Sequence, residues 1–553
     1  MKYNNRPNAD NCTDDWNKYE NGKSYNRRLK PSYYDNISIN WDFYNGNQYP
    51  GLDDVDLPKP VFNIINRLVS YFVAALTSTK VTTNIEPLAY RDDDFQFEQE
   101  QNAAEIANAE IGNLFGKFRM QAKLRDALID GAVSGDYCAH YMFNPNAEAY
   151  GGAFENVQGE IEMELVDGSN VYFGNANNPR IEVQPYVIIA GRASVEELKK
   201  EAESYKAKDA NITDDRDTAE QVGQGGEIEI EGDNGTGKAT YIIIYKKGKN
   251  GNILVSKSVQ SAYIYQDIDT GLKRYPVAWA NWEKQKNQYH GKALVTGLIP
   301  NQIYINKMFA MLMYFLMNNA FPKPVYDADK VASWTTDLGV ALPVHGLQPG
   351  ESIRNAAGYL EFGQSSQQVT QTIDLAMQYT KEMSGATDAA LGEIKPDNAS
   401  AVIAVQRQSA IPLENPKANL YEWVYDSCMI LLDMMGAKYG MRPIVVEVEG
   451  RKQYVMFDFS GFSKLNLNVS VDVGSGSYWS EIASQTTLDN LLTAERISFL
   501  QFLERTPEGY IPDKAGLIAE VKEQQEIQEQ MQAMQAPMMP EGMPQEMPQE
   551  IPM

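Results

Sequence analysis

The segment Gly232–Lys238 has the residue spacing best suited to chemistry, because GDNGTGK matches the GxxxxGK pattern of a phosphate-binding loop. Such a loop presents phosphates to a helix N-terminus and uses a following Ser or Thr hydroxyl to bind Mg²⁺. Here the next residue is Ala239, and the strand-like TYIIIY follows. Asn234-Gly235 is typical of a hairpin turn. We therefore expect a turn and no nucleotide site.

The histidines and cysteines do not form a recognisable site either. The three histidines are His140, His290 and His345, which by local spacing give neither a metal centre nor a Ser-His-Asp triad, so structural or surface roles are expected. The three cysteines, Cys12, Cys138 and Cys428, are far apart and lack CxxC spacing. No disulfide framework or zinc site is predicted, and a reducing cytosol suits this chain.

The acidic residues could bind a divalent ion, but their spacing favours loops. Asp267, Asp269 and Gly271 imitate the start of a calcium loop, yet the twelfth position is Ala278 in place of Glu. The remaining clusters are predicted to be solvated loop charge: Asp53, Asp54, Asp56, Asp92, Asp93, Asp94, Asp214, Asp215 and Asp217. We therefore predict no catalytic residue, no metal, no cofactor and no enzyme activity.

Overall charge limits the partners. The 553 residues include 49 Lys and Arg against 74 Asp and Glu, giving a net charge of −25. This balance argues against gripping nucleic acid by neutralising phosphates, although nucleic acid could still slide past the protein. The apolar run Met308–Met317 is shorter than the ~20 residues that span a bilayer, and the polar N-terminus does not resemble a secretory signal. A soluble protein without a membrane partner is expected.

The first half of the chain predicts an α+β domain. Residues 1–40 are expected to be extended or disordered, and order to begin near Trp41. Helices are expected from Val61 and over Asp94–Val133, and GEIEMELVDG alternates as a half-buried strand. The further elements expected are strands at Tyr186–Ala190, Glu227–Glu231, Tyr241–Tyr245, Ile253–Val255 and Tyr263–Gln266, and a helix at Ser194–Glu203.

The middle of the chain predicts two helices around a small insert. The first, residues 291–320, ends in the apolar run Met308–Met317, which must be covered on every side and is most simply a buried core helix, with a subunit interface as the second interpretation. Residues 321–364 are bounded by Pro and read as a strand-and-turn module. The second helix, residues 365–385, has one stripe, Val369, Ile373 and Met377, which needs one neighbour, for which another copy of the chain is one candidate.

A loop and a late sheet follow. Residues 386–400 are rich in Gly, Asp, Asn and Pro, and a third helix is expected from Ala399, broken around Pro412 and Pro416. PIVVEVEG, QYVMFDF and LNLNVSVDV alternate as strands, with Leu465, Leu467, Val469, Val471 and Val473 on one face. Leu488–Gln530 reads as helical, and the Pro-repeating tail 531–553 is expected to be disordered.

This order of elements resembles the portal protein, or head-to-tail connector, of tailed bacteriophages over roughly residues 40 to 530. The resemblance rests on LRDALIDGAVSGDY, on YPVAWANWEKQKNQYHGKALVTGLIPNQIYINK and on SGATDAALGEIKPDNASAVIAVQRQ. It implies a virion protein, made in the host cytoplasm, that forms a homo-oligomeric ring, usually a dodecamer, at one vertex of the capsid. Double-stranded DNA would pass through this channel during genome packaging and ejection.

The resemblance also implies a division of the chain and a set of partners. The implied parts are an N-terminal arm (1–40), wing (41–290), stem helix (291–320), small α/β clip (321–364), stem helix (365–385), tunnel loop (386–400), kinked long helix and remaining wing (401–480), crown (481–530) and tail (531–553). The clip would dock the large subunit of the terminase motor during packaging and a head-tail adaptor afterwards. The major capsid protein and a scaffold would surround the ring.

In this interpretation the stem and tunnel loop would face DNA. Lys381 or Lys395 could centre the duplex, and Asp388, Glu393 and Asp397 could repel it. Gly392 and Asn398 belong to the same loop. Twelve chains of −25 would carry about −300, so a largely acidic channel would let DNA slide without trapping it.

Two alternatives stand beside the portal hypothesis. One is another structural virion component, such as a tail adaptor or scaffold-like protein, which would lack a closed wide-bore ring. The other is a phosphate-loop enzyme built on Gly232–Lys238, which the following strand and Ala239 disfavour.

Overall fold

The computed structural model describes most of the chain. The described residues are 12–50, 58–78, 81–88, 94–148, 157–207, 210–215, 237–320, 323–335, 337, 340–359, 367–384, 411–448, 451–465, 467–472, 487–494, 496–506, 511, 514, 516–518 and 520–522. Helices and antiparallel sheets are both present, so the fold class is α+β. The chain divides into two compact units, one of Met1–Ile444 with Val455–Gly474 and one of Val445–Tyr454 with Ser475–Met553.

The largest sheet has the strand order β4-β5-β6-β7-β8. These antiparallel neighbours are β4 (Val171–Phe173), β5 (Tyr186–Ser194), β6 (Lys238–Lys247), β7 (Ile253–Ser258) and β8 (Tyr263–Asp269). The strands expected around residues 186, 241, 253 and 263 are therefore confirmed. The helix expected at residue 194 is also confirmed as α6 (Val195–Ser204), with Ser194 accepting a hydrogen bond from the Glu197 N–H. The strand expected at Glu227–Glu231 lies outside the described residues.

The two faces of this sheet are covered by different helices, because side chains alternate along each strand. α6 packs on the face that carries Ala239 and Ile264. α1 (Cys12–Arg28) packs on the opposite face, where Trp16 and Tyr19 contact Tyr172 and the β-strand isoleucines. Tyr19 is 0% exposed.

The expectation that residues 1–40 are extended or disordered is therefore wrong for residues 12–40. α1 occupies Cys12–Arg28, and α2 begins at Tyr33 and extends to Asn45. The polar composition was misleading because α1 buries only one stripe of its surface, and the sequence offers few apolar residues with which to recognise it.

The second sheet has the order β3-β2-β9 and lies against α10. Its strands are β2 (Asp136–Glu148), β3 (Gln158–Val166) and β9 (Val277–Asn281). The alternation expected in β3 is confirmed, because Ile161 and Met163 are buried while Glu162 and Glu164 are exposed. On α10 (Glu414–Lys438), Trp423 donates from Nε1 to the Ala278 carbonyl at 3.1 Å.

The predicted break at Pro416 does not occur. Pro416 lies in the first turn of α10, where a missing N–H costs no helical hydrogen bond. Pro412 lies in a short 3₁₀ turn, Ile411–Leu413, that precedes α10.

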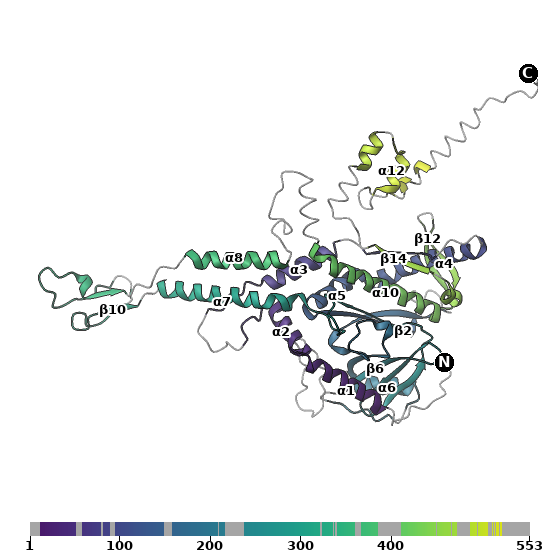
Figure 1. Ribbon diagram of the computed structural model, residues 1–553, viewed down its shortest axis with the longest axis horizontal. Helices are drawn as coiled ribbons and strands as arrows, with labels where there is room; N and C mark the ends of the chain where they lie inside the picture. Colours follow the sequence, from purple (N-terminus) through teal and green to yellow (C-terminus); the bar gives the residue numbers. More distant parts are fainter. Residues whose placement is uncertain are drawn as a thin grey trace, which may run out of the picture. The chain divides into compact units, whose positions relative to one another are not determined.

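Four helices, α2, α3 (Ile64–Leu76), α5 (Met120–Ser134) and α7 (Leu294–Ala320), pack side by side (Figure 1). Buried amides join them: Gln302 of α7 donates to the Phe62 carbonyl at 2.9 Å and accepts from the Ile64 N–H at 3.1 Å. The first half of α7 therefore satisfies backbone groups at the start of α3. The single helical block expected over Asp94–Val133 is divided into α4 (Asp94–Phe118) and α5 by Arg119, which has φ +52°.

Two smaller sheets each consist of two strands. β1 (Thr82–Pro87) pairs with β14 (Leu467–Asp472), in which Val469 is buried and Asn468 and Ser470 are exposed, as the alternation predicts. β12 (Met441–Val448) pairs with β13 (Arg451–Asp458). Over Leu488–Gln530, which was expected to be helical, the described residues contain short helical segments, including α12 (Phe499–Arg505), which begins at a capping box of Ser498 and Gln501.

Replacing Tyr19 with Ala is expected to lower the free energy of unfolding by about 3–5 kcal/mol, because a buried aromatic ring is lost from the contact between α1 and the sheet. The Arg28→Ala change, at an exposed position of the same helix, should alter it by less than about 0.5 kcal/mol. Denaturant unfolding of both variants checks this. Equal stabilities would contradict the docking of α1.

Candidate functional site

The most distinctive local feature is the pair of helices α7 and α8 (Gln367–Ser384), which lie side by side in Figure 1. Between them the chain forms a small module in which β10 (Pro324–Tyr326) pairs with β11 (Ala357–Tyr359). Val331 and Ala356 are buried in this module, and the Trp334 ring lies between Tyr326 and Tyr359. The strand-and-turn insert predicted from the sequence is thus present. The described part of it contains a 3₁₀ turn but no α-helix.

The expected stripe on α8 is the face that becomes buried. Ile373 is 2% exposed, and Val369 and Met377 are half-buried. The neighbour along this face is α7 of the same chain, so the stripe does not by itself require a second copy. Lys381 lies near the end of α8 and is half-buried.

A second apolar stripe on α8 stays exposed. Leu375, Tyr379 and Met383 follow one another at four-residue spacing and are 46%, 53% and 85% exposed. They form what we call the outer stripe of α8, on a different side of the helix from Ile373. The remaining side is polar, with Gln371, Asp374 and Gln378 exposed. α8 therefore has three faces: one against α7, one apolar and exposed, and one polar and exposed.

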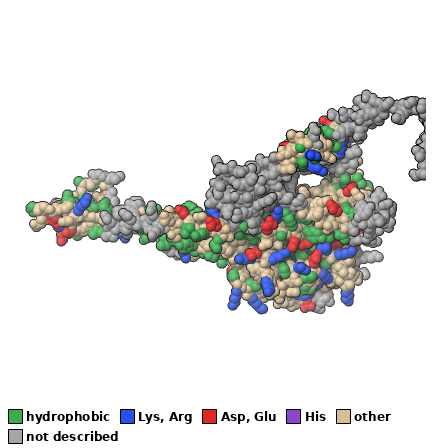
Figure 2. Space-filling model, turned by 45° about the horizontal axis from the view of Figure 1, so that its top comes forward, with side chains coloured by type: hydrophobic (Ala, Val, Ile, Leu, Met, Phe, Trp, Pro, Cys, Tyr) green, Lys and Arg blue, Asp and Glu red, His purple; other side chains and the backbone are tan. Residues whose placement is uncertain are grey.

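The apolar run of α7 is also exposed along much of its length, so its interpretation as a buried core helix is wrong. The exposed members are Met311, Met313, Tyr314, Leu316 and Met317, with exposures between 40% and 66%. Only the first half of α7 has α2, α3 and α5 around it, and beyond them the described neighbour is α8. Figure 2 shows hydrophobic side chains gathered on this helix pair, with few charged side chains between them.

Charge on the two helices does not follow the charge of the whole chain. Lys307 and Lys381 are balanced by Asp374 and Glu382, so α7 and α8 together are electrically neutral. The acidic surplus lies elsewhere in the sequence, and these helices do not provide an acidic wall. The predicted tunnel-loop residues Asp388, Gly392, Glu393, Lys395, Asp397 and Asn398 all lie outside the described residues.

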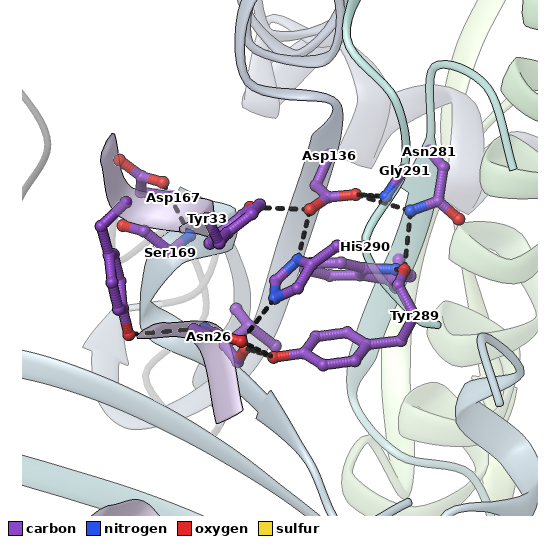
Figure 3. Close-up of polar contacts among 12 residues, drawn as sticks. Asn26, Tyr33, Asp136, Asp167, Ser169, Asn281, Tyr289, His290 and Gly291 are labelled. Atoms are coloured by element: carbon purple, nitrogen blue, oxygen red, sulfur yellow. Dashed lines mark hydrogen bonds and ion pairs between the residues drawn. The ribbon is translucent and has the colours of Figure 1, made fainter. Parts of the chain in front are cut away.

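A buried polar network fixes the place where the chain enters α7 (Figure 3). At its centre is Asp136, the first residue of β2. Its carboxylate accepts hydrogen bonds from Tyr33 Oη at 2.7 Å, Asn281 Nδ2 at 2.6 Å, the Gly291 N–H at 2.7 Å and His290 Nδ1 at 2.6 Å. These donors belong to α2, to β9 and to the segment that leads into α7, so a single carboxylate connects three parts of the fold.

The backbone around this network is packed too closely to admit side chains. Gly135 has φ +98°, and a Cβ there would lie 2.7 Å from the Gly291 carbonyl oxygen. A Cβ on Gly291 would lie 2.6 Å from the Gly135 carbonyl oxygen. Both positions therefore require glycine, and the entry to α7 is held by backbone contact as well as by Asp136.

Buried charge shapes the titration of neighbouring groups. Burial, followed by the negative charges of Asp167 and Asp126, raises the pKa of Asp130 to about 7. Burial also raises the pKa of Asp167, and the charge of Asp136 adds to that effect. Burial and the charge of Asp136 raise the pKa of Tyr33, whose hydroxyl therefore remains a donor.

The alternative sites considered from the sequence gain no support. Lys238 is the first residue of β6 and pairs with Ser194, so a strand follows the phosphate-loop pattern where a helix would be needed. The other residues of that pattern, apart from Gly237, lie outside the described residues. Asp269 accepts from the Gly271 N–H at 2.8 Å, which is the predicted turn.

Asp215 is not the solvated loop charge that was expected. Its carboxylate lies 2.6 Å from Arg192 Nη1 and accepts from the Thr240 N–H at 2.8 Å, so it joins β5 and β6. The error has a simple cause, since Arg192 lies 23 residues earlier in the chain and no local pattern links the two.

His140 and His290 are buried structural residues, as expected. His140 Nε2 lies 2.8 Å from the Tyr245 hydroxyl, and burial, with a contribution from the charge of Lys257, lowers the pKa of His140 to about 4. Within the described ranges there is no group of three or more His, Cys, Asp or Glu side chains able to hold a metal ion. None of the helices described combines the length and apolar content that crossing a bilayer takes.

Comparison with models of protein families and with curated protein sequences gives no match to this chain.

Replacing Asp130 with Asn is expected to change how stability depends on pH. Because folding raises the pKa of Asp130 from near 4 to about 7, the folded state binds this proton more tightly, and stability is lost as pH rises through that interval. The Asn variant has no carboxyl group at this position, so it does not lose this stability as the pH rises. Relative to the unaltered protein, it should therefore gain roughly 2–4 kcal/mol between pH 4 and pH 8.

Denaturant titrations across this pH range measure the difference. Asp329→Asn, at an exposed position, provides the control and should leave the pH dependence unchanged. Parallel curves for Asp130→Asn and the unaltered protein would contradict the half-buried, charge-crowded environment of Asp130.

Proposed function

We propose that this chain is the subunit of a bacteriophage portal, a closed homo-oligomeric ring at one capsid vertex through which double-stranded DNA enters and leaves. The observation that carries the proposal is the exposed apolar surface of α7 and α8 on a helix pair that brackets a small module. An exposed apolar surface of this kind marks a site that binds another protein. In a ring, each copy of the chain can cover this surface on its neighbour.

The physical gain from covering these helices is considerable. Fully burying an apolar side chain of this size contributes roughly 1.5–3 kcal/mol. Covering half of each exposed side chain in the apolar run of α7 and in the outer stripe of α8 therefore contributes about 1 kcal/mol per residue. A neighbouring copy offers the same apolar residues on its own α7 and α8. The polar face of α8 then remains for the bore.

An acidic channel that repels DNA phosphates was expected from the sequence, whereas α7 and α8 together carry no net charge. A neutral channel wall also lets DNA move without being held. Firm attachment of DNA requires Lys and Arg that displace counterions from phosphates. The exposed polar face of α8, with Gln371, Gln378 and Asp374, offers no such surplus of positive charge. The duplex would slide past amide groups without being trapped.

In this proposal the β10–β11 module is the clip, which would meet the terminase large subunit and later a head-tail adaptor. The sheets and the helices around them form the wing, placed among the major capsid protein and scaffold. The ring, expected to be a dodecamer in the virion, has no catalytic role of its own, and the ATPase is a separate protein. A different virion connector is the second candidate, which a failure to close a ring would favour.

The Met383→Glu change is expected to prevent ring assembly. Met383 is 85% exposed in the single chain, so the substitution costs the fold little, whereas in the ring it would bury a charge. The concentration for half-assembly should rise by more than about tenfold, equivalent to ~1.4 kcal/mol per contact. Sedimentation velocity measures it.

Gln371→Glu is the matched control because it adds the same charge on the polar face of the same helix. This variant should assemble like the unaltered protein. If Met383→Glu also assembles normally, the outer stripe does not lie between copies.

Deleting Leu391–Asn398, or replacing Gly392, should leave ring assembly intact and reduce DNA packaging or retention. This follows from assigning residues 386–400 to the bore, away from the contacts between copies. Packaging of DNA into particles, followed by nuclease protection, measures the effect. Normal packaging and retention by these variants would refute the loop assignment.

A further inference from the structure

The sulfur atoms of the described residues divide into buried thiols and exposed thioethers. The three cysteines, Cys12, Cys138 and Cys428, are each at most 1% exposed. Burial raises the pKa of each of these thiols, so all three stay protonated near pH 7, the form that reacts poorly with peroxides. In this part of the chain, the sulfur atoms that a reagent in water can reach therefore belong to methionines.

The exposed methionines gather on α7 and α8. Among the residues that the structure describes, six methionines are at least 40% exposed, and four of these lie on the helix pair: Met311, Met313, Met317 and Met383. Met383, at the end of the outer stripe of α8, is 85% exposed. The other two, Met441 and Met456, lie in β12 and β13. The surface with the most uncovered apolar area is thus also the one richest in accessible thioethers.

Peroxides convert a methionine thioether into a sulfoxide. A lone pair of the sulfur attacks one peroxide oxygen, so that an S–O bond forms and the O–O bond breaks. The sulfur loses two electrons and the peroxide gains them. When the oxidant is hydrogen peroxide, its second oxygen leaves as water and carries both protons away. The product is a polar, chiral side chain in place of a flexible apolar one.

Oxidation changes what α7 and α8 can contact. While the helices are exposed, water solvates the sulfoxide oxygen, so the reaction costs the fold of the single chain little. When an apolar surface covers the same side chain, the S–O group loses this water, and burying a polar group without a hydrogen-bond partner is unfavourable. A sulfoxide at Met383 would meet this cost next to Leu375 and Tyr379, the other members of the outer stripe.

We propose that the thioethers of Met311, Met313, Met317 and Met383 form a modification site for peroxides, and that their oxidation prevents copies of the chain from covering α7 and α8. The inference rests on the proposed function, because it takes the covering surface to be another copy of the chain. Oxidation acts on the unassembled chain, since contact between copies shields these sulfur atoms. Reduction of the sulfoxides reverses the effect.

Peptide mapping by tandem mass spectrometry tests the site in the unassembled chain. After brief treatment with hydrogen peroxide, Met311 and Met383 should gain oxygen at least about tenfold faster than Met434 and Met435, which are 2% and 0% exposed. The two buried methionines also report on the fold, because they stay unmodified only while the core stays closed. Equal rates at exposed and buried methionines would overturn the proposal.

Sedimentation velocity then compares the assembly of untreated, oxidised and repaired protein. Oxidation should raise the concentration for half-assembly by at least about tenfold, because polar groups must then be buried between copies. Methionine sulfoxide reductases acting on both epimers should restore the original value. Rings formed before peroxide is added should keep Met311 and Met383 unmodified.

The outcomes separate this inference from the proposed function. Rings that form equally well from oxidised chains would refute the inference and leave the proposed function standing. If the untreated protein forms no ring, the proposed function is refuted and the inference falls with it.

Conservative variants show which methionines are responsible. Replacing Met311, Met313, Met317 and Met383 together with Leu keeps apolar side chains of similar size, so this variant should assemble normally and become insensitive to peroxide. All other methionines of the chain remain in place.

The matched control replaces Met441 and Met456 with Leu, because these residues are exposed but lie outside the helix pair. Its assembly should remain as sensitive to peroxide as that of the unaltered protein. A helix-pair variant that stays sensitive, or a control that becomes insensitive, would place the responsible methionines elsewhere and refute the proposal.

Discussion

The central constraint is that α7 and α8 carry more apolar side chains than the described part of the chain covers. α7 and α8 contact one another along one face each, yet Met311, Leu375 and Met383 remain in water when the chain is alone. These helices hold few charges, so solvation by ionic side chains does not compensate. The simplest remedy is repetition, because a second copy brings the same apolar faces. In the proposed closed ring, every copy would cover these faces of its neighbour, and the polar face of α8 would lie toward the axis.

The opposite end of α7 is held by polar contacts. Asp136 accepts hydrogen bonds from four donors in three parts of the chain, and Gln302 of α7 accepts a hydrogen bond from the Ile64 N–H at the start of α3. Buried polar groups that are fully satisfied define one arrangement and disfavour others. The chain thus combines a firmly positioned start of α7 with an outer half whose apolar side chains are exposed. This combination suits the proposed subunit, which would present its helices at a set angle to neighbouring copies.

Much of the fold could be predicted from local pattern. The alternation of Ile161 and Met163 with glutamates predicted β3, and the helical pattern over Ser194–Glu203 predicted α6, because both patterns are local in the sequence. α1 was missed because its polar composition carries a single buried stripe. Pro416 was read as a break, although proline is tolerated in a first turn. The Asp136 network joins residues more than 100 positions apart, and no spacing in the sequence reveals it. The exposure of Met311 could not be predicted, since a run of apolar residues does not show whether its cover comes from its own chain.

Electron microscopy of the purified protein tests the central claim most directly. The account predicts a closed ring with an open central hole, in which α7 and α8 from neighbouring copies stand beside one another around that hole. A protein that remains a monomer under assembly conditions, or a ring with α7 and α8 at its outer edge, would contradict it.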